Sequence, residues 1–213
     1  QVMADRVFEG RTIEVYLRAE ESEENLMLAD RAGWRLLDTA VLSVRMLRTD
    51  AQAQPVHYLD RSAEEKRLGL VSKPFEALVV GFGQTGREAL AFLYETASFH
   101  DADLHKTPFV CHLVDHDHQT RAEDWRRRCP DTLDGGILFE PLNDRKAGYW
   151  EWLPSLVGRL SYMVVATGND EANIRIAVSL LRLYLKVTGG ERPLPPGIYV
   201  RLRSPQAVAK LAA

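Results

Sequence analysis

Cysteine is scarce in this 213-residue sequence, long uncharged stretches are absent, and basic residues are not in excess. Cys111 and Cys129 are too few for a disulfide framework, so we expect a reducing, cytoplasmic setting. The longest stretches without a charged residue are ten residues, at Ala77–Gly86 and Leu160–Asn169, whereas a membrane-spanning helix needs about 20 apolar residues. Lys and Arg total 27 against 30 for Asp and Glu, a net charge of −3. This balance argues against a nucleic-acid binder that works by bulk charge.

The composition is that of an ordinary globular protein, with 46% hydrophobic and 27% charged residues. The length suffices for one large domain, or for one domain with part of another. The chain begins with Gln1 and no signal-like apolar segment follows. We therefore expect a piece of a longer protein, and membrane attachment elsewhere in that protein stays open.

From residue 74 onward, short apolar runs alternate with stretches of helical periodicity. The runs are Phe75–Val80, Phe109–Val114, Ile137–Phe139, Tyr162–Ala166 and Ile198–Leu202. Near-continuous apolar strands separated by helices are typical of a parallel sheet covered on both faces. The sequence therefore predicts an α/β fold with a doubly wound parallel sheet.

The clearest predicted helix follows the fourth apolar run. Its core-facing residues, chosen by helical spacing, are expected to be Ile174, Ala177, Val178, Leu181 and Leu185. Asn169 or Asp170 is expected to cap the start of this helix, and Gly189 with Gly190 to end it.

Residues 1–72 differ from the remainder, since they hold ten basic and thirteen acidic residues. We expect a strand at Ile13–Arg18, helices near Glu23–Ala32 and Asp38–Arg48, a linker at Ala51–Pro55 and a charged piece at Ser62–Arg67. No glycine-rich turn precedes the predicted strand, so this segment is not a complete nucleotide-binding fold.

One short internal similarity bears on the domain organisation. Residues 15–18 (VYLR) match residues 198–201 (IYVR) in type at each position. A tandem repeat and chance similarity between two strands both explain this match. We predict two parts: residues 1–72 are the C-terminal remnant of a preceding copy plus a linker, and residues 73–213 are a nucleotide-binding domain.

The strongest chemical signal is the glycine turn, Gly81–Gly86, which has the pattern G-x-G-x-x-G between a predicted strand and a predicted helix. In this setting Gly81 permits a tight turn, Gly83 lets a pyrophosphate approach the backbone, and Gly86 lets helix and strand pack closely. The N–H groups at the positive end of the helix would face the phosphates. A glycine-rich turn that binds nothing is the alternative.

Asp115 directly follows the second predicted strand, where an acidic residue accepts hydrogen bonds from ribose hydroxyls. It lies 29 residues beyond Gly86, farther than the usual interval of about 20, because the intervening connection is long. An acidic residue here favours NAD(H) over NADP, with ATP or ADP as alternatives. The nearby Arg121 keeps a 2′-phosphate ligand open.

The Thr167 loop, Thr167–Asn169, follows the fourth predicted strand at the point where the strand order of a doubly wound sheet reverses. We expect Thr167 and the Gly168 backbone to line the ribose or the adjoining phosphate. The alternative is that these residues only cap the helix that follows them.

With these elements, the chain resembles the TrkA-N (RCK) family, the NAD-binding regulatory domains of bacterial potassium transporters and channels. The resemblance rests on VVGFGQTGREAL (79–90), HLVDHD (112–117) and VVATGNDEANI (164–174), and it covers about residues 75–202. It implies a Rossmann-like sheet, tandem or dimeric assembly, and NAD(H) or adenine nucleotides bound as regulatory ligands without turnover.

The resemblance also implies which residues contact the ligand. Together with their immediate neighbours, the candidates are Gly81, Phe82, Gly83, Gln84, Thr85, Gly86, Asp115, His116, Thr167, Gly168 and Asn169. Two features depart from the family pattern: the connection from Tyr94 to Phe109 is long, and residues 140–143 (EPLN) replace a short acidic turn. The second departure affects the expected contacts on the adenine side.

Other chemistry is weakly indicated. The stretch 112–118 (HLVDHDH) needs a particular loop to converge on a metal, so we expect polar loop residues instead. Cys111 is expected to be buried, and Trp125–Arg128 to be a solvated helix face. Trp150 and Trp152 are expected to pack on the core, with an interface as the alternative.

We therefore expect a non-catalytic nucleotide-binding regulatory module that controls potassium or other cation transport. A homo-oligomer or tandem-domain packing and a membrane transport protein are the expected partners; nucleic acid is not. The competing classes are an NAD-dependent oxidoreductase whose catalytic residues lie outside this chain, and an assembly module with a vestigial site.

Overall fold

The computed structural model describes residues 16–18, 35–37, 39–59, 67–68, 70–71, 73–132, 136–143, 145–189 and 196–204. The chain divides into two compact units, Gln1–Leu42 and Ser43–Ala213. In the smaller unit, β1 (Tyr16–Arg18) pairs in parallel with β2 (Arg35–Leu37). β1 confirms the strand predicted at Ile13–Arg18 over its described residues, Tyr16–Arg18. The strand β2 was not predicted. The predicted helix at 23–32 and residues 62–66 lie outside the described residues.

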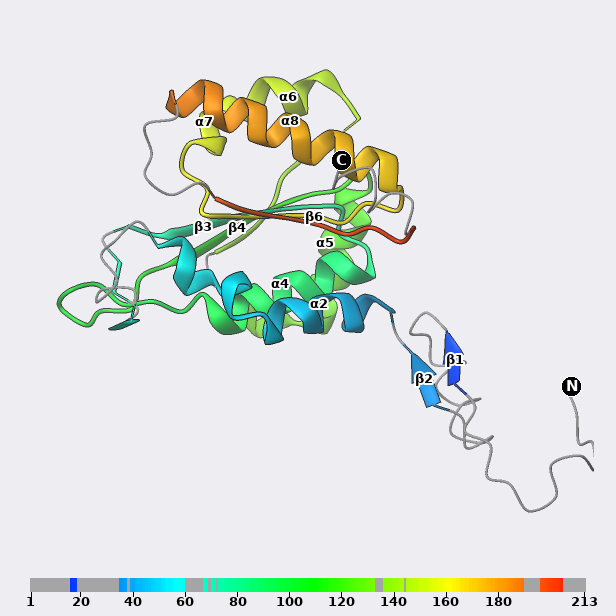
Figure 1. Cartoon of the computed structure of the whole chain (residues 1–213), viewed down its shortest axis with the longest axis horizontal. Coiled ribbons are helices and arrows are strands. Elements are labelled where there is room, and N and C mark those ends of the chain that lie inside the picture. The colour runs from blue at the N-terminus through cyan, green and yellow to red at the C-terminus, as the bar shows by residue number, and fades with distance from the viewer. Residues whose placement is uncertain are drawn as a thin grey trace, which may run out of the picture. The chain divides into compact units, whose positions relative to one another are not determined.

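The larger unit contains one parallel sheet of five strands, which are β3 (Phe75–Val80), β4 (Phe109–Val114), β5 (Ile137–Phe139), β6 (Tyr162–Val165) and β7 (Gly197–Val200). Their order in the sheet is β5-β4-β3-β6-β7 (Figure 1). Three strands have the predicted bounds, β6 ends one residue early, and β7 is shifted toward the N-terminus. The protein is thus an α/β protein with a Rossmann-like, doubly wound sheet, as the sequence predicted.

Helices cover both faces of this sheet (Figure 1). One face carries α4 (Gln84–Thr96) and α5 (His118–Arg128), and the other carries α6 (Ala147–Trp152), α7 (Pro154–Val157) and α8 (Asp170–Thr188). Alternate residues of β3 enter the two cores: Ala77 and Val79 pack with α4, while Leu78 and Val80 pack with α8. No helix among the described residues is long and apolar enough to cross a membrane.

The buried face of α8 differs from the predicted one. Asn169 caps the helix by accepting from the Ala172 N–H, and Gly189 ends it in the left-handed conformation, as predicted. The residues that face the core are Asn173, Ile176, Ala177, Leu180 and Tyr184. Of the five residues expected there, only Ala177 is buried, so the predicted orientation is wrong. Helix α8 is apolar on two faces, and the sheet covers the face that contains Ile176 and Leu180.

The segment expected to be a linker is packed on the sheet. It forms two short 3₁₀ turns, Ala51–Ala53 and Pro55–Tyr58, in which Ala53 and Pro55 are buried. The helix α2 (Thr39–Thr49) precedes them, close to the predicted 38–48. The larger compact unit therefore begins before the predicted boundary at residue 73. The derivation of residues 1–72 from a preceding copy stays a prediction.

Three tyrosines fix these turns to the sheet. The Tyr58 hydroxyl lies 2.6 Å from that of Tyr199, and the Tyr162 hydroxyl donates to the Ala53 carbonyl at 2.9 Å. The rings of Tyr162 and Tyr199 stack with their centroids 4.8 Å apart. Burial raises the pKa of both Tyr162 and Tyr199, so they act as neutral hydrogen-bonding groups.

Candidate functional site

The glycine turn and the Thr167 loop meet at the carboxyl end of the sheet. They follow the adjacent strands β3 and β6. These strands lead to helices on opposite faces of the sheet, so the two loops lie at its topological switch point. A Cβ atom placed on Gly81 would lie 2.6 Å from the Thr167 backbone nitrogen. The structure therefore brings together the two loops that the sequence singled out.

Two of the three motif glycines are required by close packing. Gly81 has φ +89°, which side-chain-bearing residues rarely adopt. A Cβ on Gly86 would lie 2.1 Å from the Gly81 carbonyl oxygen. The first turn of α4 thus rests directly on the turn that precedes it, and this contact fixes where the helix begins.

Gly83 and Gly168 lie beside open space. A Cβ on either residue would meet no atom within 4 Å, and Gly83 has φ −74°. Gly83 is also the N-cap of α4 and supplies no side-chain hydrogen bond to the helix. The arrangement thus places a helix N-terminus, with its partial positive charge, next to a space that an anionic group can enter.

The Asp115 carboxylate holds the glycine turn against β4. One oxygen accepts the Phe82 N–H at 2.7 Å, and the other accepts the Asp117 N–H at 2.9 Å. The side chain is only 7% exposed, and His116 Nδ1 lies 3.1 Å from the second oxygen. Contact between Asp115 and a ribose stays a prediction, and such a contact would use the lone pairs that these bonds leave.

The remaining residues of the glycine turn differ in how they face the open space. The Phe82 side chain is completely buried against Trp125 and Phe139, so it cannot reach a ligand beside Gly83. Thr85 is buried in the first turn of α4, and Gln84 is half-buried.

The Thr167 loop is held by Asn173, a buried residue that the sequence reasoning missed. The Asn173 Oδ1 accepts from the N–H and the hydroxyl of Thr167. Its Nδ2 donates to the carbonyls of Thr167 and Arg201, at 3.2 and 2.8 Å. The Thr167 N–H therefore points at Asn173 rather than at the open space. The sequence does carry a signal for the burial of Asn173, since this residue lies in helical register with Ile176, Ala177 and Leu180.

The start of α8 is also bonded to the segment that follows β7. Both Asp170 carboxylate oxygens accept from the Arg203 N–H at 3.0 Å, and Oδ2 also accepts from the Ser204 N–H at 2.8 Å. Together with the bond from Asn173 to Arg201, these contacts join the Thr167 loop to residues 201–204.

Two arginines lie beside the glycine turn. Arg87, in the first turns of α4, forms an ion pair with Asp124 at 3.0 Å. Hydrogen bonds from Arg127 and Arg128 hold the pKa of Asp124 below its usual value. Arg121 Nε lies 4.0 Å from Asp115 Oδ1 and is buried without a hydrogen-bond partner. Arg121 therefore places a guanidinium group within 4.0 Å of the acid expected at the ribose.

The histidines of residues 112–118 do not converge. His112 is buried on the α6 side of the sheet, where Nδ1 lies 2.7 Å from Glu140 Oε1 and Nε2 lies 3.7 Å from Glu76 Oε2. His116 lies instead beside Asp115. Among the described residues, the one group of His, Cys, Asp or Glu whose ligand atoms all lie within 4.8 Å of one another is Asp101, Asp103 and His105, in a loop where Asp103 and His105 are exposed.

Other sequence expectations concern single residues. Cys111 is fully buried, and burial raises the pKa of its thiol. The solvated face predicted for Trp125–Arg128 is confirmed for the exposed Arg126, Arg127 and Arg128 but is wrong for Trp125, which is buried in the core. Trp150 and Trp152 are partly buried against the core, as expected.

The fold and the site define an α/β protein with a glycine turn at the switch point of its parallel sheet. Neither a scan against protein-family models nor a search of curated proteins finds a match. A search of solved structures finds the crystal structure of a GsuK mutant, at 14% sequence identity and a TM-score of 0.48. The match covers 93% of this chain and 39% of that one, so this chain spans well under half of the matched protein.

Proposed function

We propose that this protein is a regulatory module that binds NAD(H), with ATP or ADP as the alternative ligand, and that it acts without turnover in the control of cation transport. The observation that carries the proposal is the open space beside Gly83 and Gly168, which lie on two loops that meet at the switch point. The resemblance of three sequence segments to the TrkA-N family supplies the expected ligand and the link to potassium transport.

In this proposal the phosphates lie over Gly83, at the N-terminus of α4, and the rest of the ligand extends toward Asp115 and the Thr167 loop. Backbone N–H groups and the helix dipole favour an anion there. Arg121 offers a cation that a 2′-phosphate would need, so NADP(H) belongs in the comparison of ligands.

The regulatory step in the proposal is a change in the Thr167 loop. A ligand that contacts Gly168 would act on Thr167 and, through Asn173, on the carbonyl of Arg201. The effect would reach residues 201–204 and bias how the domain packs against a neighbouring copy or a transport protein. A ligand shifts such an equilibrium only by its difference in affinity for the two states.

Isothermal titration calorimetry tests the binding step, with NAD⁺, NADH, NADPH, ATP and ADP titrated into the chain. We expect binding that is lost in Gly83→Leu, because the leucine side chain would occupy the space beside the helix N-terminus. Gly148→Leu is the matched control, since Gly148 also faces open space but lies on α6. Failure of all five nucleotides to bind contradicts the proposal.

Absence of turnover is a separate part of the proposal. NADH oxidation by the chain is followed at 340 nm with a panel of carbonyl substrates. We expect no reaction above background. Substrate-dependent oxidation that is lost in Gly83→Leu would favour the oxidoreductase alternative.

A further inference from the structure

Arg121 lies beside Asp115 but is not fully paired there. Its Nε lies 4.0 Å from Asp115 Oδ1, which is beyond hydrogen-bond distance. This Nε atom is buried and has no hydrogen-bond partner in the described part of the chain, although the side chain as a whole is 35% exposed. A buried N–H group without an acceptor costs free energy. Arg121 therefore has unused capacity to bind an anionic group of a ligand.

The Asp115 carboxylate, by contrast, has little capacity left for a ligand. Its Oδ2 accepts the Phe82 N–H at 2.7 Å. Its Oδ1 accepts the Asp117 N–H at 2.9 Å and lies 3.1 Å from His116 Nδ1. The side chain is only 7% exposed. Both carboxylate oxygens are thus already engaged within the protein.

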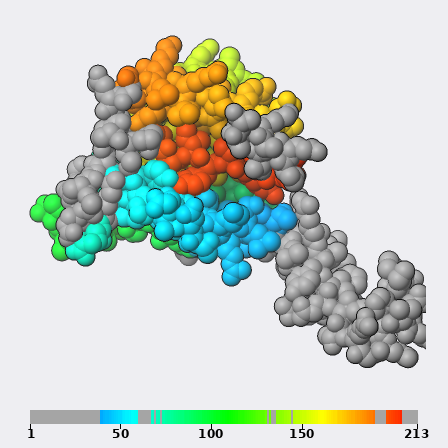
Figure 2. All heavy atoms as spheres, viewed as in Figure 1, coloured from blue at the N-terminus to red at the C-terminus, as the bar shows by residue number. Residues whose placement is uncertain are grey.

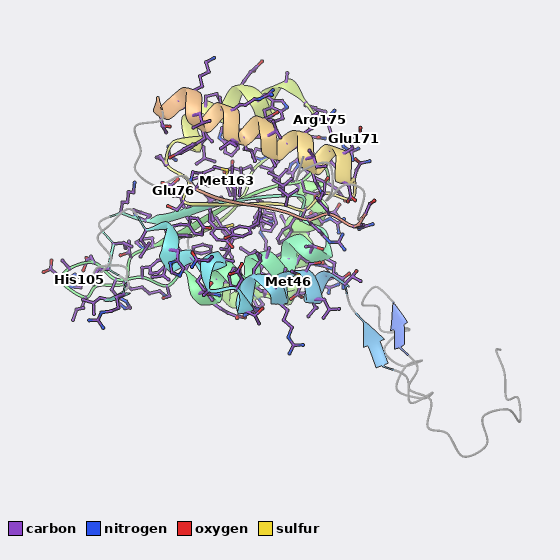
Figure 3. The ribbon with its side chains drawn as sticks, in the orientation of Figure 1. Met46, Glu76, His105, Met163, Glu171 and Arg175 are labelled. Carbon is purple, nitrogen blue, oxygen red and sulfur yellow. The ribbon has the colours of Figure 1, made fainter. Side chains whose placement is uncertain are left out.

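These groups lie at the carboxyl end of the sheet, where the nucleotide of the proposed function is expected. The helix α5 begins there, directly after Asp117, and α8 begins there after the Thr167 loop. Figure 3 labels Glu171 and Arg175 in the first turns of α8. In Figure 2 the yellow atoms at the start of α8 lie on the surface of the molecule.

The usual role of an acidic residue at the Asp115 position is to select a ribose without a 2′-phosphate. Its carboxylate accepts hydrogen bonds from the ribose hydroxyls, and it repels a phosphate because like charges placed side by side are costly. That selection requires carboxylate oxygens that face the ligand. The engaged oxygens of Asp115 and the unused capacity of Arg121 favour the opposite outcome.

We infer, on the basis of the proposed function, that the ribose end of the site admits a 2′-phosphate and that Arg121 pairs with it. The module then binds NADP(H) at least as tightly as NAD(H). A guanidinium group binds a phosphate through two parallel N–H groups. Arg121 can turn from Asp115 to the phosphate because the contact that it leaves is long, and Asp115 keeps its two backbone N–H groups.

Calorimetric titration of the intact chain with NADPH and with NADH tests the inference. We expect the dissociation constant of NADPH to be no larger than that of NADH. A site whose carboxylate faces the ribose would instead bind NADPH ~100-fold more weakly. A larger dissociation constant for NADPH would overturn the inference and leave the proposed function intact, whereas a lack of binding by every nucleotide would contradict the proposed function itself.

Arg121→Gln separates the contact with the 2′-phosphate from other contributions to binding. Because glutamine is polar but uncharged, we expect NADPH to bind ~10-fold more weakly and NADH to change by less than ~2-fold. Arg126→Gln is the matched control, since Arg126 is an exposed arginine on the same helix, and it should change neither affinity. Equal losses for the two ligands would assign Arg121 to the diphosphate that they share. That result, or an unchanged affinity for NADPH, would overturn the inference.

Arg121→Lys tests the charge alone, because lysine keeps the positive charge but lacks the two parallel N–H groups. We expect its affinity for NADPH to lie between those of the unaltered chain and Arg121→Gln. An affinity as low as that of Arg121→Gln would contradict the charge pairing. Circular dichroism checks that each variant is folded. If a variant fails to fold, the ratio of the two dissociation constants of the unaltered chain still decides the inference.

Discussion

The two loops at the switch point are held in different ways. The glycine turn is held by a carboxylate, since Asp115 accepts one N–H from the turn itself and one from its own loop. The Thr167 loop is held by a neutral amide, since Asn173 both accepts from and donates to Thr167. An amide can satisfy donors and acceptors together, so Asn173 can link the loop to β7, whereas Asp115 can only gather N–H groups.

The loops also differ in how much space surrounds their glycines. Gly81 and Gly86 are enclosed by backbone atoms, whereas Gly83 and Gly168 face open space. The enclosed glycines are therefore required by the fold. The open ones are free to serve a ligand. Substitutions at these positions should separate the two roles.

The largest effect is expected for Gly86→Ala. The new methyl group would meet the Gly81 carbonyl oxygen, a backbone atom that cannot move without displacing the turn from α4. We expect a loss of about 3 kcal/mol in the free energy of unfolding, measured by urea denaturation with circular dichroism. Gly148→Ala should change it by no more than about 0.5 kcal/mol. Similar values for the two variants would contradict the enclosed position of Gly86.

Replacing the buried Asn173 by leucine should cost about 2 kcal/mol, because partly buried backbone groups of Thr167 and Arg201 would lose their partner. The same denaturation measurement checks this value. Hydrogen exchange adds a local readout: we expect faster exchange at Thr167 and unchanged exchange at Phe82. Equal acceleration at both amides would show that the two loops are not held independently.

A smaller effect is expected for Asp115→Asn. The amide keeps one acceptor oxygen but presents an NH₂ group to one of the two N–H donors, so we expect a loss of about 1.5 kcal/mol. Hydrogen exchange should accelerate at Phe82 or Asp117 and not at Thr167. The exposed Asp117→Asn is the control, with a change within about 0.5 kcal/mol. A loss no larger than in this control would show that the Asp115 carboxylate does not hold the glycine turn in place.

The smallest effects on stability are expected for Gly83→Ala and Gly168→Ala, since neither methyl group meets an atom. Gly168→Ala should change the free energy of unfolding by less than about 0.5 kcal/mol. Gly83→Ala should cost no more than about 1 kcal/mol, because alanine is less favourable than glycine at a helix N-cap. A loss above about 1 kcal/mol in either variant would mean that the open glycines also serve the fold.

The arrangement of the sheet was predictable because each strand is a short apolar run bounded by polar or turn residues. The Asp115 position was predictable from topology even though its spacing from Gly86 is unusual. The orientation of α8 was not predictable, because the helix has two apolar rows. Ile176 and Leu180 belong to one row, and the other consists of Ile174, Val178, Leu181 and Leu185. Only contact with the sheet selects between the two rows.

Long-range contacts account for the other differences. Nothing local to Ala51–Pro55 indicates packing, and its place depends on Tyr162 and Tyr199, which lie more than a hundred residues further along the sequence. The role of Asn173 was equally hidden, since its partners include a carbonyl on the far side of the Thr167 loop, after β7. Sequence patterns locate the loops of the candidate site, but tertiary contacts decide which atoms face outward.

The burial of Phe82 has a practical consequence for optical measurements. Its ring lies edge-on to the Trp125 indole, with the centroids 5.6 Å apart, and its N–H is bonded to Asp115. A displacement of the glycine turn must therefore alter the surroundings of an indole that lies outside the open space. Trp125 is thus an intrinsic fluorophore for this turn, and replacing the tryptophans elsewhere in the chain by phenylalanine would isolate its emission.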